Sequence, residues 1–130
     1  MTQKDLEQFI IIKLELEQLK ESKKDLEEKK DIIKSQIITD MPKGGGTAQT
    51  MEDIVGKIET IILQIAKKYL KISEVLLNIE RTIEKLEPME RVLMRYRYIC
   101  DMTFYQIGKK LKYSERHIKR LHKDILNKIA

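Results

Sequence analysis

Apolar residues recur every three or four positions along the first 38 residues, and this spacing constrains the fold more than any other feature of the chain. The series contains two lysines among apolar residues: Phe9, Ile12, Leu16, Leu19, Lys23, Leu26, Lys30, Ile33 and Ile37. Alternating steps of three and four align residues along one side of a helix, as in a coiled coil. We therefore expect one helix from Thr2 or Gln3 to about Ile38. Its apolar seam is expected to be open to solvent at Lys23 and Lys30.

A proline and three consecutive glycines separate this segment from a second one. Residues 40–47 include Pro42 and Gly44 to Gly46, which favour a linker over a continued helix. Thr50 followed by Asp53 is typical of a helix start, so we expect a second helix from about Thr50. Its apolar positions shift by one step at Tyr69: Met51, Ile54, Ile58, Ile61, Ile65, Tyr69, Ile72, Leu76, Ile79, Ile83 and Leu86.

The second segment also carries apolar residues outside that seam, namely Ile62, Leu63, Leu70, Val75 and Leu77. Two helices packed on each other would leave much of this surface exposed, and exposed apolar patches usually mark a partner surface. The sequence therefore predicts a homodimer or a higher homo-oligomer formed through residues 1–86.

Glu87-Pro88 marks the next boundary, because proline is tolerated in the first turn of a helix but not inside one. Three short helices fit the remainder, at about 88–100, 103–111 and 114–129, with Thr103 and Ser114 as N-caps. The predicted fold is all-α: a long, coiled-coil-like antiparallel helical hairpin over residues 1–86, followed by a three-helix helix-turn-helix domain over residues 87–130.

The charge is uneven along the chain. Residues 87–130 hold 11 Lys and Arg against 5 Asp and Glu, whereas residues 1–40 hold 8 against 10. In the last helix, Ile118, Leu121, Ile125 and Ile129 would face inward, against Ile107, Leu111, Val92 and Tyr96. The opposite face would carry Glu115, Arg116, Lys119, Arg120 and Lys123. This division suits a helix in the major groove of double-stranded DNA, although a merely solvated face is the simpler alternative.

Two stretches carry a family resemblance: LEPMERVLMRYRY (86–98) and TFYQIGKKLKYSERHI (103–118). They resemble the C-terminal region of bacterial sigma factors, which reads a promoter element. The resemblance places the base-reading positions on Glu115, Arg116, Lys119 and Arg120. Lys112 stands where that family has a small turn residue, so a turn that needs positive φ would be strained there. We assign DNA phosphate contacts to Thr103, Lys109, Lys110, Lys112, Ser114, His117 and Lys123.

The whole chain resembles the phage and prophage ArpU and RinA regulators of late gene transcription. That resemblance implies a sequence-specific DNA-binding regulator that can also engage RNA polymerase. Two alternatives stay open. One is a DNA-packaging subunit like the small terminase of a phage. The other is an adaptor that docks on RNA polymerase or a sigma factor through the hairpin without reading DNA.

Other signals predict no enzyme, cofactor, metal site or membrane segment. His117 and His122 are five residues apart and so lie on different helix faces, and the glycine run lacks the order of a phosphate-binding loop. Cys100 is expected in the core, His122 at the core's edge, and the aromatic residues 96, 98, 104, 105 and 113 in packing rather than base stacking. A single cysteine fits a cytoplasmic setting.

Overall fold

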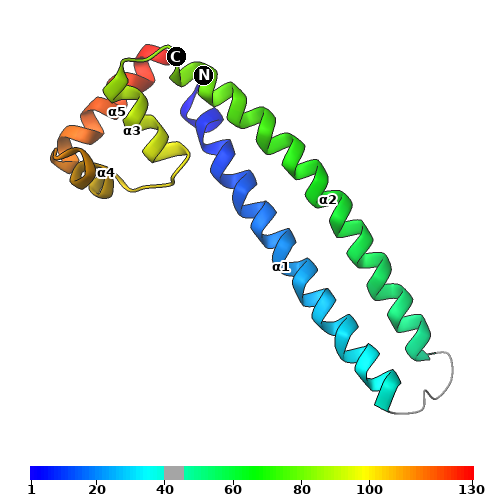
Figure 1. The fold of residues 1–130 in the computed structure, drawn as a ribbon. Coiled ribbons are helices and arrows are strands. Elements are labelled where there is room, and N and C mark those ends of the chain that lie inside the picture. The colour runs from blue at the N-terminus through cyan, green and yellow to red at the C-terminus, as the bar shows by residue number, and fades with distance from the viewer. Residues whose placement is uncertain (40–45) are drawn as a thin grey trace. The chain divides into compact units, whose positions relative to one another are not determined.

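The computed structural model describes residues 1–39 and 46–130, with side chains for residues 1–36 and 51–130. Within these ranges the chain forms helices and no strand: α1 (Gln3–Thr39), α2 (Gly46–Ile83), α3 (Pro88–Tyr98), α4 (Phe104–Leu111) and α5 (Glu115–Ile129) (Figure 1). The predicted all-α fold, a long helical hairpin followed by three short helices, is confirmed. No helix in the described ranges is long and apolar enough to cross a membrane.

The predicted helix boundaries need two corrections. α2 begins at Gly46 and not near Thr50, because glycine lowers helix propensity without forbidding helical geometry. α3 ends at Tyr98 rather than at about residue 100. Most of the predicted linker, residues 40–45, lies outside the described residues.

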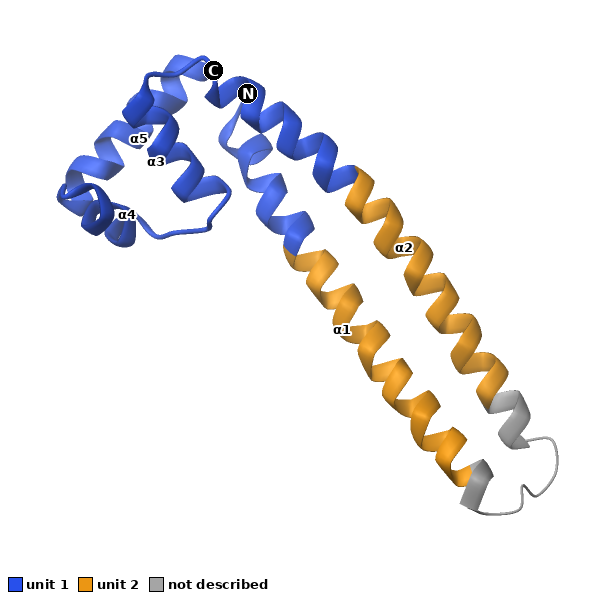
Figure 2. Ribbon diagram, in the orientation of Figure 1, with its two compact units in different colours: residues 1–13, 71–130 blue, residues 14–70 orange. Residues whose placement is uncertain are grey.

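The chain divides into two compact units, which Figure 2 shows in two colours. One unit consists of residues 14–70, and the other of residues 1–13 together with residues 71–130. The boundary that we predicted between residues 86 and 87 lies within the second of these units.

In the unit of residues 14–70, α1 and α2 run antiparallel and bury the predicted seam. Leu16, Ile54 and Ile58 are at most 9% exposed. Lys23 and Lys30 are half-buried at the seam positions expected of them, and Lys23 pairs with Glu27 at 3.5 Å. The three-and-four spacing therefore identified the buried side of α1 correctly.

The predicted seam of α2 is wrong at Tyr69, although the later positions Ile79, Ile83 and Leu86 are buried as predicted. Lys68 is half-buried and pairs with Glu15 of α1, whereas Tyr69 is 45% exposed and lies under the ammonium group of Lys20. A lysine can occupy an apolar seam because its aliphatic stem packs while its charged end reaches a partner. The seam continues through Lys68 to Val75, which is buried.

In the unit of residues 1–13 and 71–130, the ends of the two long helices share one core with the three short helices. α1 contributes Leu6, Phe9 and Ile12 to the buried cluster, and α2 contributes Val75, Ile79 and Ile83. The short helices add Leu93, Met94, Tyr98, Ile107, Ile118 and Ile125. The helix-turn-helix is thus packed on residues that we had assigned to the hairpin.

Candidate nucleic-acid interface

Both short helices of the helix-turn-helix start at the N-caps predicted from the sequence. The Thr103 hydroxyl accepts the backbone N–H of Gln106 at 3.2 Å, and the Gln106 side chain accepts the N–H of Thr103 at 2.9 Å. At the start of α5, the Ser114 hydroxyl accepts the backbone N–H of His117 at 3.1 Å. These contacts, which are reciprocal at Thr103, satisfy amide groups that a helix start leaves unpaired. They fix where each helix begins.

The turn between α4 and α5 is close-packed around one glycine. Lys112 takes left-handed geometry, with φ 62° and ψ 40°, and its N–H donates to the carbonyl of Gly108. The N–H of Tyr113 donates to the same carbonyl at 2.8 Å. The expectation of a strained backbone at Lys112 is confirmed, because residues with a Cβ seldom adopt this region. Asp101, at φ 55°, is a second such position that the sequence did not suggest.

α5 separates apolar from charged residues as predicted. Ile118 and Ile125 are buried, and Leu121 and Ile129 pack against the same cluster half-buried. The opposite side is exposed and carries Glu115, Arg116, Lys119, Arg120 and Lys123. Residues 115–120 bring all four predicted base-reading side chains onto the first turns of α5.

Several core assignments were wrong. Val92 is 38% exposed, and its neighbours Leu93 and Met94 point inward instead. Cys100 is exposed, because it lies in the irregular segment after α3 rather than in a helix. Tyr105 and Tyr113 are 54% and 42% exposed. Val92 and Tyr105 lie on the outward sides of α3 and α4, whose buried residues include Leu93 and Ile107, and Tyr113 lies in the turn before α5.

A buried polar pair, Tyr98 and His122, lies at the centre of the domain. The Tyr98 hydroxyl and His122 Nε2 share a hydrogen bond, and the Phe104 ring packs on the histidine with ring centroids 4.9 Å apart. His122 is only 6% exposed, so the expectation that it lies at the core's edge is wrong. Burial lowers the pKa of His122 to about 4 and raises that of Tyr98 to about 12, so both groups are neutral near pH 7.

This pair predicts a specific loss of stability in acid. Because the folded state disfavours protonated His122, its contribution is complete above the ordinary histidine pKa of 6.5 and declines as the pH falls toward about 4. In that window the free energy of unfolding is expected to fall by at most about 1.4 kcal/mol per pH unit. Denaturant unfolding of the wild type and of His122→Gln isolates the effect. Equal slopes for both proteins would contradict it.

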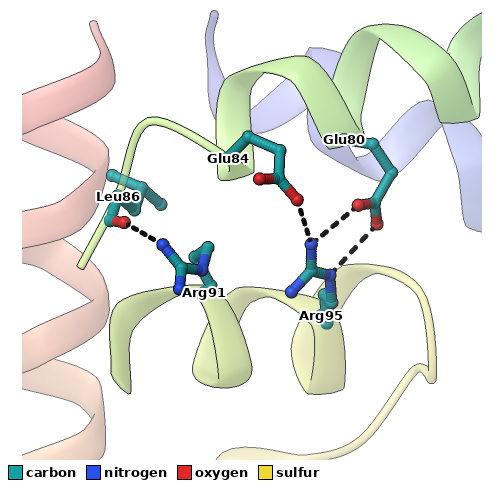
Figure 3. A network of polar contacts seen from close by, with 5 residues as sticks. All are labelled: Glu80, Glu84, Leu86, Arg91 and Arg95. Carbon is teal, nitrogen blue, oxygen red and sulfur yellow. Dashed lines mark hydrogen bonds and ion pairs between the residues drawn. The ribbon is translucent and has the colours of Figure 1, made fainter. Parts of the chain in front are cut away.

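The arginines of α3 make contacts within the protein and do not add to the exposed cationic surface. Figure 3 shows Arg95 between two carboxylates: it donates to Glu80 of α2 at 2.8 and 3.2 Å and to Glu84, just after α2, at 3.1 Å. The hydrogen bond from Arg95 lowers the pKa of Glu80. Arg91 donates to the Leu86 carbonyl at 2.9 Å (Figure 3), and Arg97 lies over the Phe104 ring. The charge count of this segment therefore overstated the cations available to a ligand.

Lys128, near the end of α5, pairs with Glu90 of α3 at 3.0 Å. The other cations of residues 87–130 gather around the turn and the outer face of α5. All are exposed: Lys109, Lys110, Lys112, Arg116, Lys119, Arg120 and Lys123. Six residues around the start of α5 line an open hollow of about 760 Å³: Lys112, Tyr113, Ser114, Arg116, His117 and Arg120. Such a concentration of positive charge beside a helix N-terminus favours a polyanion.

Three contacts at this surface were not anticipated from the sequence. Arg120 Nη2 lies 2.7 Å from Nδ1 of His117, and the Tyr113 ring packs on the His117 ring with centroids 4.8 Å apart. Glu115 and Lys119 also pair, at 3.4 Å. The spacing of three between His117 and Arg120 and of four between Glu115 and Lys119 is the signal that could have revealed them.

The comparison with protein families agrees with this geometry. Residues 82–130 match the family model of sigma-70, region 4, which covers less than half of the chain. This part of the chain is therefore a sigma region 4-like helix-turn-helix, a fold that suggests DNA binding. No curated protein and no solved structure matches the chain significantly.

Proposed function

We propose that this protein is a sequence-specific DNA-binding regulator of transcription, of the phage or prophage late-gene type, and not an enzyme. The observation that carries the proposal is the exposed cationic face on the first turns of α5, held by an N-capped turn in a domain that matches sigma region 4. In this arrangement α5 enters the major groove, where arginine and lysine reach guanine edges.

Contacts with DNA bases and contacts with DNA phosphates come from different parts of this surface. Glu115, Arg116, Lys119 and Arg120 project from the groove-facing side of α5 and read bases. The phosphate contacts lie around them, at Thr103, Lys109, Lys110, Lys112, Ser114, His117 and Lys123. Thr103 and Ser114 accept backbone N–H groups, and their hydroxyl hydrogens can donate to phosphate oxygens.

Alanine substitutions separate the two roles. Arg116→Ala is expected to weaken binding to the preferred duplex by about 1–3 kcal/mol and binding to random DNA little, because it removes a base contact. Lys110→Ala is expected to weaken both alike. Fluorescence anisotropy with a duplex selected from a randomised pool measures each loss. Equal losses on both duplexes for both variants would remove the base-reading role of Arg116.

We also propose that the protein self-associates through α2. Between residues 55 and 70, one side of this helix exposes Ile62, Leu63, Tyr69 and Leu70 to solvent. An apolar surface of this kind is costly for a monomer and suits burial in an oligomer. A symmetric dimer would present two copies of α5 to two half-sites.

Sedimentation velocity tests this association. The double variant Leu63→Glu and Leu70→Glu is expected to be monomeric at concentrations at which the wild type is an oligomer. Gln64→Glu serves as the control and should keep the wild-type state, because Gln64 is exposed but is not three or four residues from Leu63 or Leu70. A wild type that sediments as a monomer throughout would contradict the proposal, and a ring-sized oligomer would favour the DNA-packaging alternative.

RNA polymerase is a further proposed partner, since the sigma region 4-like fold suggests it. Capture of polymerase from nuclease-treated extract by a protein that shifts no DNA would favour the adaptor alternative over the DNA-reading regulator.

A further inference from the structure

The guanidinium group of Arg120 is held by a neighbouring side chain on the exposed face of α5. Arg120 Nη2 lies 2.7 Å from His117 Nδ1, one helical turn earlier. A guanidinium group carries only donors, so Nδ1 must accept through its lone pair. The hydrogen of the imidazole ring is then at Nε2, on the other side of the ring.

His117 is itself fixed from two directions. Its backbone N–H donates to the Ser114 hydroxyl at 3.1 Å, and its ring packs against Tyr113 with the ring planes 59° apart. The side chain is half-buried, whereas Arg120 is exposed. The N-cap and the turn therefore position His117, and His117 in turn positions Arg120.

We propose that His117 is a positioning residue that sets the orientation of Arg120 for base reading, in addition to its phosphate contact. The inference rests on the proposed DNA-binding function. An arginine held by one hydrogen bond loses less conformational entropy when it meets a base than a freely rotating one. Its fixed plane also matches the bidentate acceptors of guanine. The Nε2 hydrogen is left to donate to a phosphate oxygen.

Two variants separate the positioning role from the phosphate contact. His117→Ala removes both the acceptor at Nδ1 and the donor at Nε2. His117→Asn keeps an acceptor, because the amide oxygen is bonded to Cγ as Nδ1 is, but it loses the distal donor. Both variants are expected to bind a random duplex equally, somewhat more weakly than the wild type.

The decisive measurement is base discrimination. The duplex that the wild type selects from a randomised pool is remade with each base pair changed singly, and affinities are measured for the wild type, Arg120→Ala, His117→Ala and His117→Asn. His117→Ala is expected to lose discrimination about threefold to tenfold at the base pairs where Arg120→Ala loses it, and His117→Asn to restore most of it. Unchanged discrimination in His117→Ala would overturn the positioning role.

A second readout does not need DNA. Nitrogen NMR of the histidine ring distinguishes the two tautomers, and we expect the His117 hydrogen at Nε2 in the wild type and a mixture of tautomers in Arg120→Ala. A hydrogen at Nδ1 in the wild type would overturn the proposal. A wild type with the expected tautomer that selects no duplex would show instead that the proposed DNA-binding function fails, and the positioning role with it.

Discussion

Replacing Leu6 by alanine is expected to destabilise the helix-turn-helix by about 2–5 kcal/mol, although Leu6 lies far from it in the sequence. Leu6 is fully buried, and it belongs to the same cluster as Leu93, Ile107 and Ile118 of the short helices. Truncation to alanine leaves a cavity in that shared core. Denaturant unfolding, followed through the NMR signals of α5, measures the loss of stability in the helix proposed to bind DNA.

Leu14→Ala is the matched control for this substitution. Leu14 is on the same helix but 53% exposed, so its truncation is expected to change the free energy of unfolding by less than about 0.5 kcal/mol. If Leu6→Ala were as mild as Leu14→Ala, residues 1–13 would not be part of the helix-turn-helix core.

Gly108→Ala is expected to destabilise the turn of the helix-turn-helix and to abolish tight DNA binding. A Cβ atom at this position would lie 2.6 Å from the carbonyl oxygen of Tyr113, which is a main-chain atom and has little room to move. We expect a loss near the upper end of the about 1–3 kcal/mol typical of overpacked sites. The forced shift falls between α4 and α5, so the cations around the turn lose their arrangement as well.

Gly56→Ala provides the opposite case. Nothing lies within 4 Å of a Cβ built at Gly56, which is an exposed position inside α2. Alanine is the better helix former there, so the substitution is expected to stabilise the protein by about 0.5–1 kcal/mol. Thermal unfolding of the two variants compares them directly, and a stabilising Gly108→Ala would contradict the close packing of the turn.

Local signals in the sequence were sufficient for much of this structure. The Thr103 and Ser114 caps, the buried side of α1 and the division of α5 each depend on residues within a few turns of one another. Such patterns are determined by helix geometry and by hydrogen bonding at helix ends. The positive φ of Lys112 was anticipated as well, from the resemblance to a family with a small residue in this turn.

The features that were missed depend on long-range packing. Periodicity identifies the apolar side of a helix but not the element that covers it, so Phe9 and Ile12 were assigned to a hairpin seam and not to the helix-turn-helix core. The pairing of Lys68 with Glu15 joins residues distant in sequence. The same limit applies to His122, whose burial against Tyr98 and Phe104 follows from tertiary packing.

The residue types of the candidate site and their side of α5 were predicted, but the contacts among its side chains were not. Charge counting included three arginines that the structure places in internal contacts. Arg91 donates to the Leu86 carbonyl, Arg95 pairs with Glu80 of α2, and Arg97 lies over the Phe104 ring. Among residues 87–130, the exposed cations are those at the end of α4, in the turn and on α5. The contact between His117 and Arg120 depends on rotamers that a sequence pattern does not specify.

The most direct test of the DNA-binding claim is fluorescence anisotropy of the full-length protein with a mixed duplex at several salt concentrations. The wild type is compared with a variant in which Arg116, Lys119 and Arg120 are glutamine, and with a variant of equal charge in which the exposed Lys24, Lys29 and Lys34 of α1 are glutamine. We expect micromolar or tighter binding that weakens steeply with salt, lost in the first variant and kept in the second. Equal binding by both variants, or none by the wild type at low salt, would contradict a DNA reader on α5.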